Sequence, residues 1–296
     1  MALDFGLAQH IRNTRAAHPE KLAEVYANRK RRDVIQGDGR LFIIAADHPA
    51  RGALSVRNDA MAMANRYTLL ENLALALSRP GVDGVLGTPD IIDELALMGV
   101  LDNKLVVGSM NRGGLKGAKF EMDDRVTAYD IPSILRDGLD FAKMLNRINF
   151  EDEGTANMLT ESYAAVSDAA AAGVPIMLEP FVSKWVDGKI KNDLSTEAVI
   201  NSVSIASGLG NSSAYTWLKL PVVDRMDEVM AATTLPTLLL GGDPVEDQDK
   251  TYDSWDAALA LDGVRGLVVG RTLLYPQDGN VEAAIDTAVN LVHNSK

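Results

Sequence analysis

From residue 41 onward, short apolar runs alternate with longer segments of helical period, and this alternation constrains the fold more than any other feature of the chain. It is typical of βα units arranged around a parallel sheet. The expected strands are Leu41–Ala46, Asp83–Leu86, Leu105–Gly108, Phe141–Leu145, Pro175–Glu179, Tyr215–Leu220, Pro236–Leu240 and Gly266–Gly270. The expected helices are Met61–Leu77, Ile91–Met98, Met158–Ala171, Thr196–Ser207, Met226–Ala232, Ser254–Leu261 and Val281–Val292.

Eight such units in roughly 250 residues match the size of a (β/α)8 barrel. No Pro-, Ser- or Gly-rich linker divides the chain, so we predict an α/β fold with a single (β/α)8 TIM barrel over residues 41–296. Residues 1–40 would form a helical extension, packed on the barrel floor or against a partner. The alternative is a doubly wound open sheet, which needs a glycine-rich turn after its first strand to bind a dinucleotide. That strand ends in Ala46-Asp47-His48-Pro49, which favours the barrel.

Charge and composition exclude several classes of protein. A net charge of −12 and an isoelectric point near 4.8 argue against nucleic-acid binding, which depends on clustered Lys and Arg. The absence of cysteine excludes disulfides and thiolate metal sites. The N-terminal segment lacks the pattern of an export signal, and no segment is apolar enough to span a bilayer. We therefore expect a cytoplasmic protein without nucleic-acid or membrane partners.

The basic run Arg29-Lys30-Arg31-Arg32 needs separate consideration, because clustered cations can bind nucleic acid or acidic membranes. It follows a helical stretch from Pro19 to Asn28. Positive charge suits the C-terminal end of a helix. We therefore expect this run to be a solvated face.

Four charged side chains interrupt apolar, strand-like runs and are the strongest signal of function. They are Asp47, Lys143, Glu179 and Lys219. An ionised group without partners is costly in a low-dielectric interior, so a fold does not place one at the end of a core strand without compensation. A single charged residue at such a position is more often a solvated charge at the rim of the fold, or one half of an ordinary ion pair, than part of a functional site. Because the C-terminal ends of barrel strands meet at one mouth, the four together predict a single site.

The chemistry of these residue types points to carbonyl compounds. Two acids and two amines balance when all are ionised, and burial beside a second amine lowers the pKa of a lysine. Alternation along the strand places Lys219 on the same face as Trp217 and opposite Leu218, toward the barrel interior. A free amine there could attack a carbonyl, with Glu179 transferring protons. Lys143 and Asp47 would orient hydroxyls and stabilise a developing oxyanion.

Glycines at the ends of the last two strands predict an anion site. Leu240 is followed by Gly241 and Gly242, and the final strand ends in Gly270 followed by Arg271. Loops at these positions commonly bind phosphate in barrels. Arg51, which follows Asp47, is a further candidate for binding substrate phosphate. The loop after strand 7 also carries the acidic residues Asp243, Glu246, Asp247 and Asp249.

The remaining loops leave alternatives open. The segment 109–117 could be a mobile cover, with Arg112 or Lys116 meeting a second anionic group, or an ordinary surface loop. Only His48 of the four histidines falls in the expected mouth, so we expect no histidine-rich metal site. A divalent ion held by Asp47 and Glu179 is the open alternative, although the lysines compete for the same carboxylates.

Six segments of the chain resemble class I aldolases, nearest the branch with tagatose-bisphosphate, archaeal-type fructose-bisphosphate and deoxyribose-phosphate aldolases. They are AADHPARGAL (45–54), FAKMLNRIN (141–149), PIMLEPF (175–181), WLKLPV (217–222), LLLGGD (238–243) and VVGRTLLYP (268–276). The resemblance implies that Lys219 is the Schiff-base lysine and Glu179 the proton shuttle. It also implies that Lys143 is the neighbouring amine and Asp47 the substrate-orienting acid. Gly242, Gly270 and Arg271 would hold the substrate phosphate.

These observations lead us to expect a Schiff-base aldolase that acts on a phosphorylated ketose or keto-sugar acid, with dihydroxyacetone phosphate as one fragment. We expect no cofactor and no metal, and we expect a homo-oligomer. One alternative is a barrel lyase or isomerase that uses the same residues without an imine. Another is a non-catalytic barrel that binds a sugar phosphate and regulates a partner.

Overall fold

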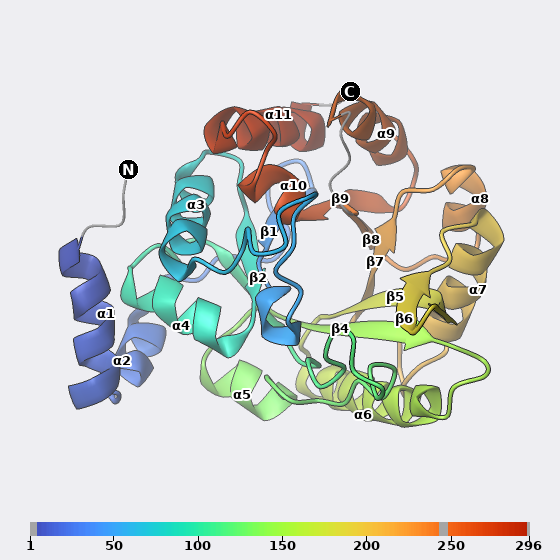
Figure 1. The fold of residues 1–296 in the computed structure, drawn as a ribbon, viewed down its shortest axis with the longest axis horizontal. Helices are drawn as coiled ribbons and strands as arrows, with labels where there is room; N and C mark the ends of the chain where they lie inside the picture. Colours follow the sequence, from blue (N-terminus) through green and yellow to red (C-terminus); the bar gives the residue numbers. More distant parts are fainter. Residues whose placement is uncertain (1–4, 243–247, 295–296) are drawn as a thin grey trace.

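The computed structural model describes residues 5–242 and 248–294, and its centre is a closed parallel barrel (Figure 1). The strands follow the order β4-β3-β2-β1-β9-β8-β7-β5, and pairing of β4 with β5 closes the ring. The predicted (β/α)8 TIM barrel is confirmed. The barrel strands are β1 (Leu41–Ala45), β2 (Gly84–Gly87), β3 (Leu105–Ser109), β4 (Phe141–Ile148), β5 (Ile176–Val186), β7 (Thr216–Pro221), β8 (Thr237–Leu240) and β9 (Val264–Val269).

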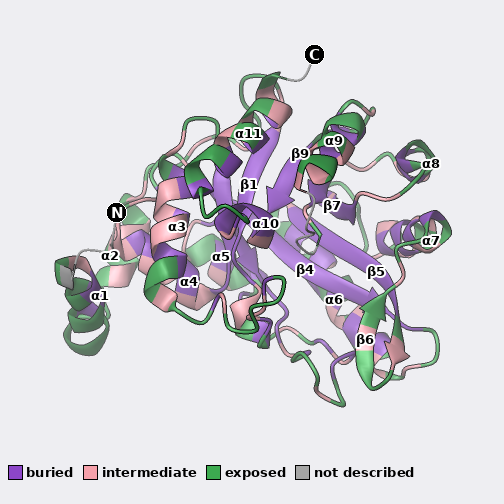
Figure 2. Ribbon diagram, turned by 45° about the horizontal axis from the view of Figure 1, so that its top comes forward, coloured by how far each residue is buried: buried purple, intermediate pink, exposed green. Residues whose placement is uncertain are grey.

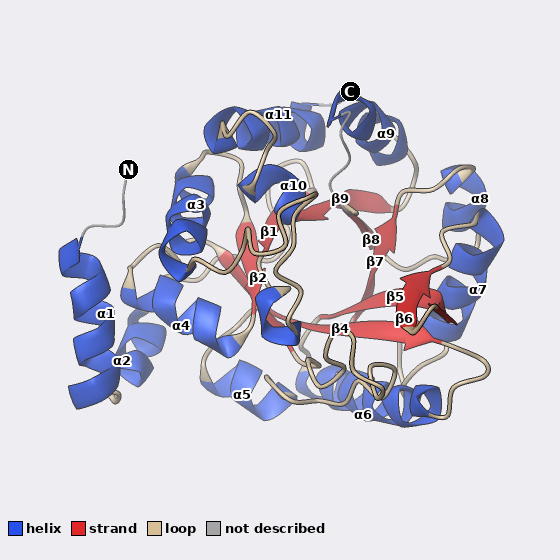
Figure 3. Cartoon of the chain, in the orientation of Figure 1, coloured by secondary structure: helices blue, strands red, loops and turns tan. Residues whose placement is uncertain are grey.

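Helices surround the barrel on its outside (Figure 3). They are α3 (Arg66–Ser78), α4 (Pro89–Leu97), α5 (Ile131–Arg136), α6 (Gly154–Ala172), α7 (Thr196–Ser207), α8 (Met226–Ala231), α9 (Gln248–Leu259), α10 (Arg271–Leu274) and α11 (Val281–Asn294). The prediction that a helix begins at Met61 is wrong, because Asn65 caps α3 by accepting from Tyr67 N and Thr68 N. The short helices α5 and α10, and the 3₁₀ turn η1 (Pro49–Arg51), were not expected from the sequence.

Side chains alternate between two apolar layers, one inside the barrel and one beneath the helices. Along β1, Leu41 and Ile43 belong to the interior cluster, whereas Phe42 and Ile44 pack in the layer below the helices. This period of two is the geometry of a strand buried on both faces. Figure 2 shows that the strands of the barrel are buried along most of their length, while the helices expose their outer faces.

A hairpin that follows the barrel part of β5 was not expected. Strand β5 continues beyond the barrel to Val186 and pairs with the antiparallel strand β6 (Lys189–Asn192). Asp187 and Gly188 form the turn, both with positive φ, and an Asp-Gly pair is a recognised hairpin signal. The lysines of this hairpin, at positions 184, 189 and 191, are exposed.

Two helices precede the barrel, α1 (Phe5–Ala17) and α2 (Lys21–Asn28), and they lie beside α4 (Figure 1). After α2 the chain reaches the barrel interior, because Val34 packs against the interior cluster. The division of the chain at residue 40 stays a prediction. No helix among residues 5–242 and 248–294 is long and apolar enough to cross a membrane.

The prediction that the basic run is a solvated face is wrong for two of its residues. The side chain of Arg29 is buried and pairs with Asp140 at 3.1 Å. Arg32 pairs with Asp83 at 2.5 Å. Asp83 and Asp140 lie at the N-terminal ends of β2 and β4, so these arginines attach the N-terminal segment to the barrel.

Candidate active site

Four strands bring the predicted charged residues to the C-terminal end of the barrel interior. Lys143 and Lys219 each stand two positions after an aromatic ring of the interior, Phe141 and Trp217, which pack edge to face at 5.5 Å. Because strand side chains repeat every two residues, the amines lie above this apolar floor. The expected inward direction of Lys219 is confirmed, since Leu218 and Leu220, on either side of it, pack in the outer layer.

Glu179 is the centre of the cluster. Its Oε1 accepts from Lys219 Nζ at 2.8 Å, and its Oε2 lies 2.5 Å from Lys143 Nζ. All three side chains are buried, with 4% of Lys219, 1% of Lys143 and 12% of Glu179 exposed. The pair of lysines therefore shares one carboxylate in a nearly dry site, and Glu179 is the member most open to solvent.

Asp47 forms the second half of the cluster. Its Oδ2 accepts from Lys143 Nζ at 3.1 Å and from Ser109 Oγ at 3.3 Å. The same oxygen pairs with the guanidinium of Arg112. Arg112 Nε also donates to Ser109 Oγ at 3.1 Å, which fixes the guanidinium beside Asp47.

Arg112 is the residue of this cluster whose position the sequence did not reveal. The sequence left open whether Arg112 lies in a mobile cover or in an ordinary surface loop, whereas in the structure its side chain is 6% exposed and bound to Asp47. The charge balance expected from four residues is corrected accordingly. The described residues of the cluster are two acids, Asp47 and Glu179, and three cations, Arg112 and the two lysines.

Burial and neighbouring charges shift the pKa values of the cluster. Burial lowers the pKa of Lys219 and lowers that of Lys143 well below its usual range, although Glu179 acts in the opposite direction on both. Arg112 repels both lysines and adds to the lowering. Burial alone would raise the pKa of Glu179, but the charges of Lys143 and then Lys219 outweigh it and lower that pKa. The geometry therefore favours an ionised Glu179 beside an amine that loses its proton easily.

His48 lies in the same mouth. Its Nδ1 is 3.7 Å from Asp47 Oδ1 and has no hydrogen-bond partner in the part of the chain that is described. Burial lowers the pKa of His48 well below its usual value, and the positive charges of Arg271 and Lys219 contribute. The imidazole is therefore neutral at pH 7. Within the described ranges, no three His, Asp or Glu side chains are grouped as metal ligands would be.

The loop between β3 and α5 folds against the mouth through buried polar contacts. Asn111 donates to Leu145 O at 2.6 Å and accepts from Leu145 N at 2.8 Å. Arg147 binds Glu121 at 2.6 Å. These contacts attach the loop to β4 and hold Arg112 at the cluster. Lys116, the other cation suggested for a second anion, contacts Ser55 Oγ at 3.3 Å and is exposed.

Arg51 lies in a different environment from the one we expected. Its guanidinium is buried, pairs with Asp124 at 3.2 Å and donates to Gly114 O. Gly114 N in turn donates to Asp124 Oδ1 at 3.0 Å. The structure therefore does not bring Arg51 to the lysine cluster, and Asp124 already balances its charge.

The glycines expected to bind phosphate lie at the ends of β8 and β9. A Cβ atom on Gly270 would lie 2.1 Å from Ala45 O, and one on Gly241 would lie 2.5 Å from a methyl group of Val269. Both positions therefore require glycine for packing. Gly242 has a φ of +67° and open space around it. Arg271 begins α10 and acts electrostatically on Lys219.

The acidic residues of the loop after β8 are only partly described. Asp243, Glu246 and Asp247 lie outside the described residues, and Asp249 lies in the first turn of α9.

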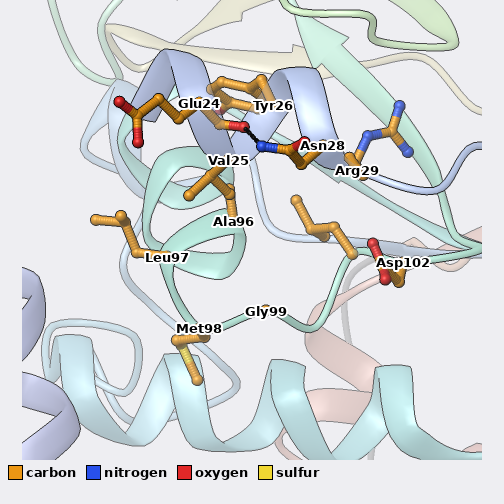
Figure 4. A pocket seen from close by; sticks show the side chains of 11 residues that line it. Glu24, Val25, Tyr26, Asn28, Arg29, Ala96, Leu97, Met98, Gly99 and Asp102 are labelled. Atoms are coloured by element: carbon orange, nitrogen blue, oxygen red, sulfur yellow. Dashed lines mark hydrogen bonds between the residues drawn. The ribbon is translucent and has the colours of Figure 1, made fainter. Parts of the chain in front are cut away.

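Two open pockets lie away from the cluster. One, of about 440 Å³, lies between α2 and the end of α4 (Figure 4). Val25 and Leu97 line it, together with Glu24 and Asp102. Another, of about 1000 Å³, lies beside α10 and α3. None of the lining residues of either pocket belongs to the lysine cluster. The candidate active site is therefore identified from the buried charged residues and not from these two pockets.

The fold and the site together define a (β/α)8 barrel with a lysine, glutamate and lysine cluster at the C-terminal end of its interior. The profile of the Cgl0159-like family matches residues 39–289, and the chain belongs to that family. The crystal structure of Cgl0159 from Corynebacterium glutamicum is 62% identical, covers 99% of both chains and gives a TM-score of 0.97.

More distant structures share the fold. An archaeal fructose-1,6-bisphosphate aldolase, whose catalytic lysine is covalently bound to the carbinolamine intermediate, is 18% identical. The match covers 92% of this chain and 99% of that one, with a TM-score of 0.65. A fructose-bisphosphate aldolase from Slackia heliotrinireducens is 14% identical over 95% and 92% of the two chains, with a TM-score of 0.58.

A curated relative matches a shorter stretch. Over 160 residues, or 52% of this chain, the sequence is 26% identical to the highly reducing polyketide synthase ZEA2 of Gibberella zeae. The chain spans 6% of the length of that protein.

Proposed function

We propose that this protein is a Schiff-base aldolase, in which Lys219 forms an imine with the carbonyl of a phosphorylated ketose or keto-sugar acid. The observation that carries the proposal is the binding of Lys219 and Lys143 to opposite oxygens of Glu179. A carbonyl-attacking amine must be unprotonated, and a buried lysine pair that shares one acid supplies such an amine. The fold shared with Schiff-base aldolases supports the same chemistry.

Lys219 is the better nucleophile of the two lysines. Lys143 contacts two carboxylates, those of Glu179 and Asp47, so it is held more firmly in place. Within the described part of the chain, Lys219 binds the carboxylate of Glu179 alone, and it is slightly more exposed than Lys143. Lys219 is therefore the amine that can leave its partner and meet a substrate.

The proposed reaction uses the cluster in three steps. Lys219, the free amine of the pair, attacks the ketone carbon through its Nζ, and a proton passes from that nitrogen to the oxygen to give a carbinolamine. The carbinolamine hydroxyl then takes a proton that Glu179 relays from the Lys143 ammonium and leaves as water, which gives a protonated imine. A base, Asp47 or Glu179, removes the proton from the substrate hydroxyl as the carbon–carbon bond breaks, and the bonding electrons pass into the imine to form an enamine.

The substrate class follows from the charges at the mouth. Arg271 and the glycines at the ends of β8 and β9 lie where barrels commonly bind phosphate. We propose that Gly241, Gly242, Gly270 and Arg271 bind the substrate phosphate and that dihydroxyacetone phosphate is the fragment held as the enamine. A homo-oligomer in the cytoplasm, without nucleic-acid or membrane partners, completes the proposal.

A coupled assay for dihydroxyacetone phosphate, run with a panel of phosphorylated ketoses and keto-sugar acids, tests this function. We expect turnover by the wild-type protein and none by Lys219→Met. Turnover by Lys219→Met would support instead a lyase or isomerase that forms no imine. Binding of the panel by calorimetry without any turnover would support a regulatory protein.

A further inference from the structure

Arg112 shares a single oxygen with Lys143. The Oδ2 atom of Asp47 contacts both the guanidinium of Arg112 and the Nζ of Lys143. Arg112 is fixed there, because its Nε donates to Ser109 Oγ at 3.1 Å and its backbone N–H donates to Thr127 Oγ1 at 3.0 Å. Burial lowers the pKa of Arg112 to about 10, which still leaves the guanidinium charged at neutral pH. The negative charge of Asp47 is therefore already balanced by Arg112 when neither lysine is protonated.

The charge count shows what this does to the lysines. With both lysines protonated, the site holds three cations against two anions. Loss of one proton from the lysine pair brings the buried cluster to neutrality. A net charge in a low-dielectric site is unfavourable, so the neutral state of the cluster is preferred.

We propose that Arg112 is a positioning residue that sets the charge of the lysine pair: by balancing Asp47, it leaves Glu179 able to hold only one of Lys143 and Lys219 as an ammonium ion. This inference rests on the proposed function, in which the other lysine is the free amine. Two interacting groups titrate as a unit, so the prediction concerns the total charge of the pair.

Other groups around the pair do not replace Arg112. His48 is neutral, and Arg271 is a further cation that acts on Lys219 in the same direction as Arg112. The two nearby ion pairs, Arg51–Asp124 and Arg147–Glu121, are each balanced internally. Among the described residues, the charged or titratable groups that face the two lysines are Asp47 and His48 after β1, Arg112 after β3, Glu179 on β5 and Arg271 at the start of α10.

The test is a pH titration of the two lysines by NMR, with ¹³C at Cε of lysine and assignment from Lys143→Arg and Lys219→Arg. In the wild-type protein we expect the pair to carry about one positive charge at pH 7.5. In Arg112→Gln the first deprotonation should move to higher pH by at least about one unit, a tenfold change in the free-amine fraction. In Asp47→Asn it should move to lower pH, and the double variant should return close to the wild-type value.

The control removes a matched ion pair that does not touch the cluster. The double variant Arg29→Gln/Asp140→Asn removes a buried pair at the N-terminal end of the barrel and should leave both lysine titrations unchanged. Should Arg112→Gln fail to fold, Asp47→Asn still decides, because its shift has the opposite sign. An unchanged first deprotonation in Arg112→Gln or in Asp47→Asn, or a doubly charged pair in the wild type at pH 8, would overturn the inference.

This titration is independent of turnover. The resonances report protonation in the protein without substrate, so failure of every carbonyl compound in the aldolase assay would defeat the proposed function alone. A wild-type adduct together with an unresponsive titration would defeat only the role of Arg112.

Discussion

Lys143 and Lys219 bind opposite oxygens of one carboxylate, that of Glu179, at 2.5 and 2.8 Å. This arrangement gives the two amines different environments although they lie on neighbouring parts of the barrel. Lys143 has Asp47 as a second partner, whereas Lys219 has no second carboxylate partner among the residues that the structure describes. The proposed roles, in which Lys143 is held in place and Lys219 reacts, follow from this difference.

Replacement of Glu179 by glutamine should separate binding from proton transfer. The amide keeps a hydrogen-bond acceptor for Lys219 but cannot take up a proton. We expect kcat to fall by about 10²–10⁴-fold, the usual contribution of a positioned acid or base. Steady-state kinetics measure this, and Glu161→Gln, on the outer helix α6, is the control. A loss of less than about tenfold would show that Glu179 is not the proton shuttle.

Replacement of Lys143 by methionine should leave imine formation possible but slow the reaction. Methionine preserves much of the buried volume, while Asp47 and Glu179 lose a shared cation. We expect an adduct on Lys219 after borohydride reduction, together with a fall in turnover of about 10²-fold or more. Mass spectrometry and the coupled assay measure the two effects. An adduct that disappears in Lys143→Met and persists in Lys219→Met would reverse the assignment of the two lysines.

His293 should make stability depend on pH. Its Nδ1 lies 2.8 Å from Asp38 Oδ2, and its pKa is raised to about 9 by Asp83 and then Asp38, against the effect of burial. Between about pH 6.5 and 9 the unfolded chain loses the proton before the folded protein does. The stabilisation is therefore complete below pH 6.5 and is lost as the pH rises toward 9.

Urea unfolding of the wild type and His293→Gln at pH 6 and pH 9.5 measures this contribution. We expect a difference in unfolding free energy of roughly 1–3 kcal/mol at pH 6, reduced by solvent screening at the partly exposed Asp38, and little difference at pH 9.5. A difference that is the same at both pH values would contradict the role given to His293.

Gly270→Ala should damage the site through the backbone. The added Cβ would lie 2.1 Å from Ala45 O, so β1 and β9 must separate just below Asp47. Overpacking of this kind costs about 1–3 kcal/mol, and we expect activity to fall with it. Gly188→Ala is the control, because its φ of +70° brings backbone strain without any close contact. A midpoint temperature of thermal unfolding that is no lower for Gly270→Ala than for Gly188→Ala would contradict the packing argument.

The sequence predicted the barrel and the central cluster because both depend on local periodicity. Charges such as Lys219 and Glu179 interrupt apolar runs at the same end of their strands, and parallel strands must bring those ends together. The Asp187–Gly188 turn carried a hairpin signal that could have revealed β6.

The positions of Arg112 and Arg51 could not be predicted from the sequence in the same way. Arg112 reaches Asp47 because Asn111 binds the backbone of Leu145, a contact between residues 34 positions apart. Arg51 forms an ion pair with Asp124, which lies 73 residues away in the sequence. Neither contact has a local signal, since an arginine in a polar loop has the same pattern whether it is exposed or buried. The prediction that Arg29 lies on a solvated face was wrong for the same reason, because its partner Asp140 lies 111 residues away.

Reduction with borohydride in the presence of dihydroxyacetone phosphate, followed by peptide mass spectrometry, tests the central claim most directly. The wild-type protein should gain the mass of one reduced adduct, located on Lys219, and Lys219→Met should gain none. The absence of any adduct on Lys219 under conditions where the wild-type protein turns over its substrate would contradict the account.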